Sequence, residues 1–500
     1  MDLDIDRRSP VPLYRQIAEA LRARILDGSI PIGSRLPSER SLARALDVNR
    51  STVVNAYDEL AADGLVIGRV GRGTAVACCP EEDEPLSRPV VWQQLFAEEG
   101  QHLVPWRQEI RSGEGRPDGA GLVSAELDPE LVPLAEVGRL LRELLDAQGS
   151  GALAYLPTEG LPPLREAIAE RLRQRGARYH PENVVITAGA QQALDLVARA
   201  FLGSDDEAAI ESPTYPGAIH AFRQRRPRLV AIPSDDQGMR IDALQQAFAR
   251  RCPILVFTIP NFNNPTGTSM SPERRGQLLQ FSRRNQIPVV EDDAFSEIYF
   301  GGERPLPLAS LTPADHVIHI GTFSKMLVPG LRVGWLAAPK PVVERVLLFK
   351  QIADLHTATL SQWLALRALE TGLVDAFLDR ARPVFARRRD ALISELTREL
   401  QGVVHLAPPQ GGLCVWCRLT EGLPARRVLG VAAERGVAFL PGDVFSVEGG
   451  HHSYLRLAFG RLREEDARGS VAVLKQAIDQ VRAESKREQG REARKVVPFV

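Results

Sequence analysis

The sequence predicts a multidomain protein in which a small winged helix-turn-helix precedes a much larger α/β domain. The chain has 500 residues, which is too long for one ordinary domain. Its first eighty residues contain three helical segments followed by two short strands around a glycine-rich turn. From about residue 108 onward, apolar runs alternate with helical stretches, a pattern typical of a parallel sheet covered by helices.

The composition is that of a globular protein, with 44% hydrophobic and 25% charged residues, and the net charge of −1 gives no overall attraction to nucleic acid or membranes. A membrane-spanning helix needs about 18 apolar residues in a row, and no such run occurs. The N-terminus is acidic and polar, so we expect no secretory signal. Five cysteines fit a reducing compartment, and we expect a cytoplasmic location. Cys414 and Cys417 form an isolated CxxC in a strand-like stretch, where they would point to opposite faces, so we expect no metal site.

The first helix is predicted from an apolar residue at every fourth position, namely Leu13, Ile17, Leu21 and Ile25. Ser38 can cap a second helix that continues to residue 46. A third helix is expected from about Arg50 to Asp63, before Gly64. Short strands at 65–67 and 74–76 would flank the turn at 68–73.

A short turn between the second and third helices would expose the start of the third, which enters the DNA major groove in helix-turn-helix modules. The residues expected to contact DNA are Arg35 and Arg40 beside the backbone, Asn49, Arg50, Ser51 and Thr52 at the helix start, and Arg72 at the wing tip. The alternative is a small helical bundle with solvated arginines, since residues 1–79 hold eleven Arg and ten acidic residues. Residues 35–50, however, carry four Arg against Glu39 and Asp47.

The stretch LPSERSLARALDVNRSTVVNAYDELAADGLVIGRVGRGTAV resembles the DNA-binding domain of GntR-type transcription regulators over nearly its whole length. The PSER box, the V-x-R-S-T turn and the G-R-G-T wing carry the resemblance. It implies a winged helix-turn-helix over residues 11–79 that binds double-stranded DNA. After it, the acidic run and prolines of residues 80–107 predict an irregular linker, although Trp92, Leu95, Phe96 and Trp106 could pack on either domain.

The large domain is expected over residues 108–483, with a charged tail at 484–500. Its buried strands are predicted at 184–187, 207–211, 254–260, 288–292 and 317–321. In a parallel α/β sheet, ligands bind at the C-terminal ends of such strands. Most of the residues with useful chemistry follow one of these ends.

The stretch HIGTFSKMLVPGLRVGW, residues 319–335, suits an anionic cofactor that carries an aldehyde. Lys325 can form an imine with an aldehyde, although it could also be an ordinary surface lysine. Thr322, Ser324 and Arg332 can hold a phosphate. The glycine turn after residue 187 would add the backbone N–H groups of Ala190 and Gln191 at a helix start.

Three further residues suit a flat, nitrogen-containing ring. Tyr215 lies just past a strand, where an aromatic side chain can stack on such a ring, although it could be a core or interface tyrosine. Asn264 lies on a Pro-Gly turn and can donate to a phenolic oxygen. Asp292 ends a buried strand, where a carboxylate needs a positive partner, such as a protonated pyridine nitrogen.

These roles share one target, pyridoxal 5'-phosphate (PLP), and the motifs NNPTG, EDDAF and GTFSK…GLRVGW resemble fold-type I aminotransferases. The resemblance implies a PLP-dependent transferase fold with a smaller C-terminal α+β subdomain, and Lys325 as the lysine that holds the cofactor. It also implies Arg456 as the site for an amino acid's α-carboxylate. Tyr155 would reach the cofactor phosphate of a partner subunit, which implies a homodimer. One departure is Phe295, where aminotransferases commonly have a tyrosine that donates to the phenolic oxygen.

The two resemblances together cover nearly the whole chain and match the MocR subfamily of GntR-type regulators. Its members are transcription factors in which PLP, or its adduct with an amine, is the ligand of the aminotransferase-like domain. We therefore expect an operator-binding regulator whose effector is an amino acid or amine. The alternative is an active PLP-dependent aminotransferase with an appended DNA-binding domain.

Overall fold

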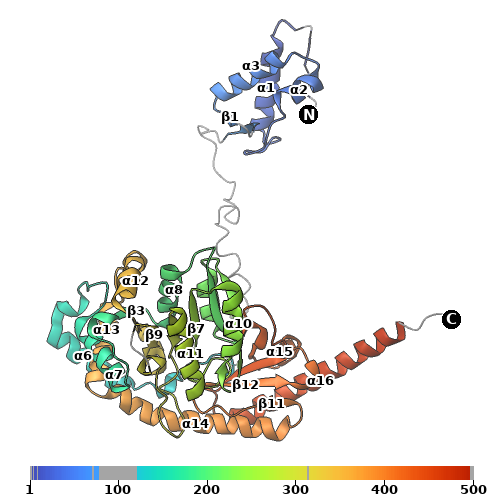
Figure 1. Ribbon diagram of the computed structural model, residues 1–500. Helices are drawn as coiled ribbons and strands as arrows, with labels where there is room; N and C mark the ends of the chain where they lie inside the picture. The colour runs from blue at the N-terminus through green and yellow to red at the C-terminus, as the bar shows by residue number, and fades with distance from the viewer. Residues whose placement is uncertain are drawn as a thin grey trace. The chain divides into compact units, whose positions relative to one another are not determined.

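The structure is a computed structural model that describes residues 3, 5–7, 9–69, 73–77, 121–311 and 315–495 (Figure 1). The predicted linker, with Trp92, Leu95, Phe96 and Trp106, and Arg72 at the wing tip lie outside these residues. The chain divides into two compact units, residues 1–96 and 97–500, which are described separately. None of the described helices combines the length and the apolar character needed to cross a membrane.

The first unit is a winged helix-turn-helix, as predicted. Its elements are α1 (Leu13–Leu26), α2 (Glu39–Leu46), α3 (Arg50–Ala62), β1 (Val66–Arg69) and β2 (Gly73–Val76). The Ser38 side chain accepts a hydrogen bond from the Ser41 N–H and so caps α2, as expected. Ile17, Leu21 and Val53 are fully buried between the helices. The apolar stripe of α1 therefore forms the core of this unit.

The second unit contains a sheet of eight strands within residues 121–311 and 315–495, in the order β3-β10-β9-β8-β7-β4-β5-β6. The strands are β3 (Val184–Thr187), β4 (Glu207–Ser212), β5 (Arg228–Asp235), β6 (Gly238–Met239), β7 (Leu255–Thr258), β8 (Val289–Asp292), β9 (Val317–Thr322) and β10 (Gly334–Ala337). The sheet is mixed and not parallel throughout, because two strands that were not predicted, β6 and β10, run antiparallel to their neighbours. β10 is antiparallel to both β3 and β9, and β6 is antiparallel to β5. The connections at 323–333 and 236–237 hold no α-helix, whereas a parallel neighbour usually needs a helical crossover.

Helices cover both faces of this sheet, because alternate strand residues enter two different cores. Val185 and Ile210 pack with α8 (Ala190–Phe201), α9 (Pro216–Arg223) and α12 (Lys340–Ala353). Val184 and Ala209 belong to the other core. The helices that contribute to that core include α6 (Leu134–Gln148), α7 (Pro162–Gln174), α10 (Ile241–Arg251), α11 (Pro272–Asn285), α13 (Thr359–Glu370) and α14 (Leu373–Glu399).

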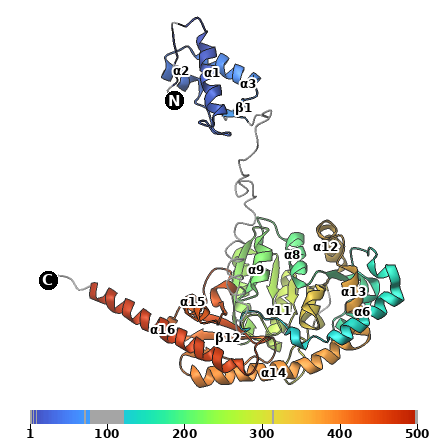
Figure 2. The same cartoon turned by 180° about the vertical axis from the view of Figure 1, so that it is seen from behind.

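A smaller α+β subdomain follows, as the sequence predicts. Its antiparallel sheet has the order β11-β12-β14-β13, with β11 (Val404–Leu406), β12 (Cys414–Leu419), β14 (Tyr454–Ala458) and β13 (Leu440–Pro441). The helices α15 (Ala425–Glu434) and α16 (Asp466–Lys495) pack on each other. The expected boundary of the charged tail, at residue 484, falls inside α16, where Glu484 and Glu488 pair with Arg427 of α15. Figure 2 shows α16 and α14 from behind.

Candidate cofactor site

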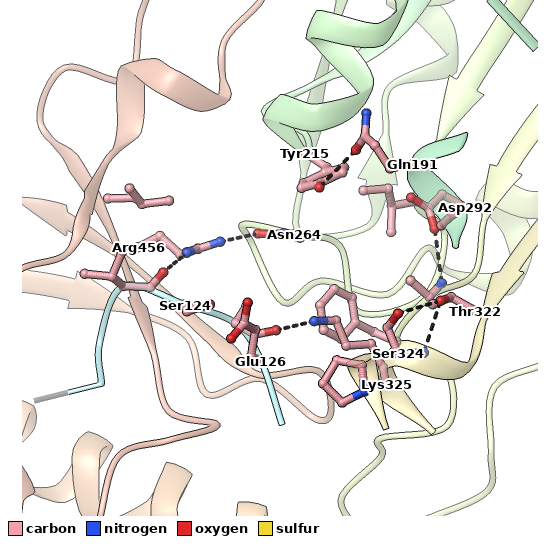
Figure 3. Close-up of a pocket in the computed structure, with 18 of the residues that line it drawn as sticks. Ser124, Glu126, Gln191, Tyr215, Asn264, Asp292, Thr322, Ser324, Lys325 and Arg456 are labelled. Carbon is pink, nitrogen blue, oxygen red and sulfur yellow. Dashed lines mark hydrogen bonds between the residues drawn. The ribbon is translucent and has the colours of Figure 1, made fainter. Parts of the chain in front are cut away.

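A cavity of about 340 Å³ lies where the C-terminal ends of several strands of the large sheet meet the small subdomain. Ten residues proposed from the sequence line it: Ala190, Gln191, Tyr215, Asn264, Asp292, Thr322, Ser324, Lys325, Arg332 and Arg456. Figure 3 shows eight of them labelled. Residues from 190 to 456 are therefore brought into one site.

Lys325 ends the short helical turn η5 (Phe323–Lys325), which directly follows β9. Its Nζ donates a hydrogen bond of 2.7 Å to the Ala125 carbonyl oxygen. Burial lowers the pKa of Lys325 to about 8, and the negative charge of Glu126 partly opposes this shift. A larger share of this amine is neutral near pH 7 than for an exposed lysine, which favours attack on an aldehyde.

An anion cradle forms beside the lysine. The Arg332 Nη1 donates to the Ser324 Oγ at 3.3 Å, and the Oγ atoms of Thr322 and Ser324 lie 3.0 Å apart. Gly189 precedes α8 with a φ of +89°, and a Cβ there would lie 2.8 Å from the Arg332 guanidinium. The N–H groups of Ala190 and Gln191 begin α8, where no intrahelical acceptor exists. Two hydroxyls, a guanidinium and a helix start together fit a phosphate.

Asp292 lies at the end of β8, with 4% of its surface exposed, and accepts a hydrogen bond from the Ala294 N–H at 3.2 Å. Burial raises the pKa of this carboxyl to about 7, and the nearby Asp293 adds to the rise. Among the described residues, no basic side chain forms an ion pair with Asp292. A protonated ring nitrogen in the cavity would supply the missing positive partner.

The remaining ring contacts come from α9 and from the NNPTG turn. Tyr215 precedes α9, and its hydroxyl donates to the Gln191 Oε1 at 3.2 Å. The Asn264 Oδ1 accepts from the Arg456 Nη1 at 3.1 Å, which leaves the Asn264 amide N–H groups to donate elsewhere. Arg456 lies on β14, is 4% exposed, and also donates to the Val123 carbonyl oxygen. The cavity can therefore hold a flat ring between Tyr215 and Asp292, with Arg456 at one side.

The sequence analysis missed one wall of the site, which is formed by residues 121–127 (the crossing segment). Val123, Ser124, Ala125 and Glu126 of this segment line the cavity, as do Ile259, Ala294, Pro329 and Leu440. The Ala458 N–H donates to the Leu122 carbonyl oxygen at 2.8 Å, so the segment extends along β14. Nothing in its residue types marks it as part of a site, because it meets Lys325 and Arg456 through backbone carbonyls.

Phe295, which was singled out only for its missing hydroxyl, also lines the cavity. Its ring centroid lies 5.6 Å from the Lys325 Nζ. The loop after β8 thus presents an apolar ring beside the lysine.

Tyr155 does not line this cavity. Its side chain is 86% exposed, and its ring meets the His356 ring edge-on at 5.4 Å. Its predicted role requires a partner subunit and stays a prediction.

In the first unit, four of the residues expected to contact DNA lie at the start of α3. Asn49, Arg50 and Ser51 are exposed there, and Thr52 is half-buried. Arg35 and Arg40 are also exposed. The Arg50 Nη2 lies 2.6 Å from the Glu39 carboxylate, a pairing that the sequence analysis did not anticipate.

Each of the two units matches the model of a different protein family. Residues 13–76 match the model of the bacterial regulatory proteins of the gntR family, and residues 127–473 match aminotransferase class I and II. The HTH-type transcriptional regulator YisV of Bacillus subtilis is 34% identical over 91% of this chain and 93% of its own length. The probable rhizopine catabolism regulatory protein MocR of Rhizobium meliloti is 31% identical over 88% of each chain.

Among solved structures, the α-aminoadipate aminotransferase LysN of Thermus thermophilus, complexed with N-(5'-phosphopyridoxyl)-L-leucine, matches with a TM-score of 0.73 and 36% identity. It covers 78% of this chain and 99% of its own. Relatives that share both units over nine-tenths of the sequence identify the whole architecture and not only its parts. The chain therefore belongs to the MocR-type family of GntR transcriptional regulators, in which a winged helix-turn-helix precedes an aminotransferase class I and II domain.

Proposed function

We propose that this chain is a PLP-binding transcription regulator whose aminotransferase-like domain senses PLP, or a PLP–amine adduct, and thereby controls operator binding. A bound PLP would supply an aldehyde that combines reversibly with amines and a ring that withdraws electrons. The phosphopyridoxyl ligand in the LysN structure supports this choice of cofactor. A regulator of this kind acts on the chromosome, which places it in the cytoplasm.

Each of the ten lining residues named from the sequence has a role in this proposal. Lys325 holds the aldehyde carbon, Asp292 faces the ring nitrogen, and Asn264 donates to the phenolic oxygen. Tyr215 stacks on the ring, and Arg456 binds the α-carboxylate of an amino-acid effector. The phosphate is held by Ala190, Gln191, Thr322, Ser324 and Arg332.

One observation carries the regulatory part of the proposal. Lys325 and Arg456, the two groups that cofactor and effector require, both donate to carbonyl oxygens of the crossing segment, at Ala125 and Val123. An aldehyde that bonds to the Lys325 Nζ would replace its hydrogen bond to Ala125, and a carboxylate at Arg456 would bind next to the bond to Val123. A change of ligand would thereby change the contacts of the crossing segment, and any difference in ligand affinity between two arrangements of the protein shifts their populations.

The proposed homodimer is supported by exposed apolar side chains on adjoining elements. Leu153, Tyr155, Leu348 and Ile352 are between 59% and 86% exposed. The Thr158 hydroxyl donates to the Gln351 side chain, so the two stretches lie side by side. A second copy covering this surface would bring Tyr155 to the partner's site and would present two winged helices to two half-sites. In each of them, Arg35, Arg40, Asn49, Arg50, Ser51, Thr52 and Arg72 would contact the DNA.

An active aminotransferase is the second candidate, because Lys325, Asp292, Asn264 and Arg456 all line one cavity. Phe295 counts against efficient turnover, since it cannot donate to the phenolic oxygen. The two functions differ in what happens after an amino acid binds. A regulator shows a single spectral change, whereas an enzyme with a 2-oxo acid present turns over continuously.

The deciding experiment measures absorbance and DNA affinity on the same purified protein. A duplex bound by the protein is first selected from a random library, and its affinity is then measured with and without PLP and a panel of amino acids. We expect a PLP band that Lys325→Ala abolishes, and an operator affinity that changes at least fivefold with ligand in wild type only. If the operator affinity is the same with and without ligand while a 2-oxo acid accumulates steadily, the protein is an active aminotransferase instead.

A further inference from the structure

Glu126 is the ionisable side chain of the cavity wall that the proposed function leaves without a role. It lies on the crossing segment beside Ser124 and Lys325, as Figure 3 shows. The other four charged lining residues already have partners: Arg332 the phosphate, Asp292 the ring nitrogen, Lys325 the aldehyde and Arg456 the α-carboxylate.

The Glu126 backbone is held firmly, whereas its carboxylate is open. A Cβ atom at Gly460 would collide with the Glu126 carbonyl oxygen, so the segment packs directly on the chain after β14. Within the described residues, the carboxylate has one ion pair, with Arg461 at 4.0 Å. Both side chains of that pair are about half exposed, at 49% and 48%, which makes it weak. The carboxylate oxygens therefore remain available to a stronger donor.

Lys325 is not that donor. Its Nζ donates to the Ala125 carbonyl oxygen, and no ion pair joins it to Glu126 among the described residues. In the proposed function this amine is moreover consumed by the aldehyde. The donor that remains for the Glu126 carboxylate is therefore a group of the bound ligand.

We infer that the effector is an α-amino acid whose side chain carries a second positive charge, an amine or a guanidinium, and that Glu126 is the residue that selects it. This inference rests on the proposed function, in which Arg456 fixes the α-carboxylate. With that end fixed, the wall formed by Ser124 and Glu126 receives the side chain. Leu440, which pairs with Arg456 across β13 and β14, and Ile259 offer apolar contact for the intervening methylenes. A charge-assisted hydrogen bond to Glu126 then separates cationic side chains from apolar ones of equal length.

The test compares amino acids matched in length. Dissociation constants of L-ornithine against L-norvaline, and of L-lysine against L-norleucine, are measured on the PLP-loaded protein by absorbance change and by calorimetry. We expect wild type to bind the cationic member of each pair at least fivefold more tightly. Glu126→Gln should remove this preference while the variant still forms the PLP absorbance band.

Glu130→Gln is the matched control, because Glu130 lies just after the crossing segment and pairs with Arg463 at 2.8 Å on the surface, outside the cavity. It should keep the wild-type preference. A wild type that binds both members of each pair equally, or a Glu126→Gln variant that weakens both equally, overturns the inference while leaving the proposed function intact. Absence of a PLP band overturns both. A cationic preference without any change in operator affinity supports the inference and contradicts the regulatory proposal alone.

Discussion

The Nζ atom of Lys325 lies 2.7 Å from the carbonyl oxygen of Ala125, two hundred residues earlier in the chain. This hydrogen bond joins the end of β9 to the crossing segment, and Arg456 makes a second connection to the same segment at Val123. The reactive group of the site and the crossing segment are therefore in direct contact. A change in the bonding of Lys325 cannot leave this stretch unaffected.

The lowered pKa of Lys325 predicts how PLP binding depends on pH. Only the neutral amine attacks the aldehyde, and burial lowers the pKa to about 8. The rate of PLP binding should therefore rise with pH and level off above about 8. Stopped-flow absorbance from pH 6.5 to 10 measures it. Glu126→Gln should move the midpoint lower still, because the Glu126 charge raises this pKa. A rate that keeps climbing up to pH 10 would show that the lysine is not desolvated.

Asp292→Asn should affect cofactor binding and stability in opposite directions. The asparagine has no charge to pair with a ring nitrogen, so PLP affinity should fall at least tenfold, a change of about 1.4 kcal/mol.

Without PLP, the same change should stabilise the protein. The folded-state pKa of Asp292, about 7, lies above its ordinary value of 3.8, so the folded form holds the proton more tightly than the unfolded chain. Wild-type stability is therefore lost as pH rises from about 4 to 7, by at most about 4 kcal/mol. The variant's neutral amide carries no such penalty. In denaturant unfolding of both cofactor-free proteins, the variant should have the larger free energy of unfolding at pH 8 and the same free energy of unfolding as wild type near pH 4. Equal stability at pH 8 would contradict the burial argument.

Sequence patterns predicted most of the strands, because β3, β4, β7, β8 and β9 are short apolar runs that end in polar residues. The antiparallel strand β10 was not predicted. Its first two residues, Gly334 and Trp335, end the 319–335 stretch, which was interpreted as a cofactor site. Its direction depends on pairing with β3 and β9 in the folded sheet. The crossing segment was missed for a similar reason. Its place is fixed by Arg456 and Ala458, more than three hundred residues away, and local pattern holds no information about such contacts.

Site residues that follow strand ends could be found from the sequence because the parallel sheet aligns those ends. Glu126 could not be recognised as a lining residue in this way, because it precedes the first strand of the sheet. Phe295 follows the end of β8, but it carries no polar group, so only the resemblance to aminotransferases pointed to it. The pairing of Arg50 with Glu39 joins two helices across a turn and likewise depends on the folded geometry.

DNA binding should depend on Arg50 and Arg40 in different ways. Arg50 lies at the start of α3 and must leave Glu39 before it can contact a base, so Arg50→Ala should weaken binding to the selected operator by roughly tenfold and relax its specificity. Arg40→Ala should weaken binding to all DNA sequences alike and should lower the slope of log K against log salt concentration by about one.

Fluorescence anisotropy at several salt concentrations measures both effects. Arg15→Ala serves as the control, because Arg15 lies on α1 next to the Tyr14 ring, outside the predicted contact set. Equal losses of DNA affinity in all three variants would indicate non-specific electrostatic attraction and would contradict a role of α3 as the recognition helix.

Phe295→Tyr should lower the pH at which the absorbance of the bound cofactor changes. Phe295 is 6% exposed and faces the Lys325 amine at 5.6 Å, and Asn264 is the donor proposed for the phenolic oxygen. A tyrosine hydroxyl would be a second donor. Because a hydrogen bond from this hydroxyl would favour the charged form of the phenolic oxygen, the midpoint of the absorbance titration should fall by about one pH unit.

A spectrophotometric titration of wild type and variant with PLP bound measures this difference, with PLP and free lysine as the reference. The tyrosine should also raise any transamination rate, since it restores the donor that aminotransferases commonly have at this position. A titration midpoint as low in wild type as in Phe295→Tyr would mean that another group already supplies the missing hydrogen bond. In that case Phe295 would no longer be an argument against catalytic turnover, and the result would favour an active aminotransferase over a regulator without enzymatic activity.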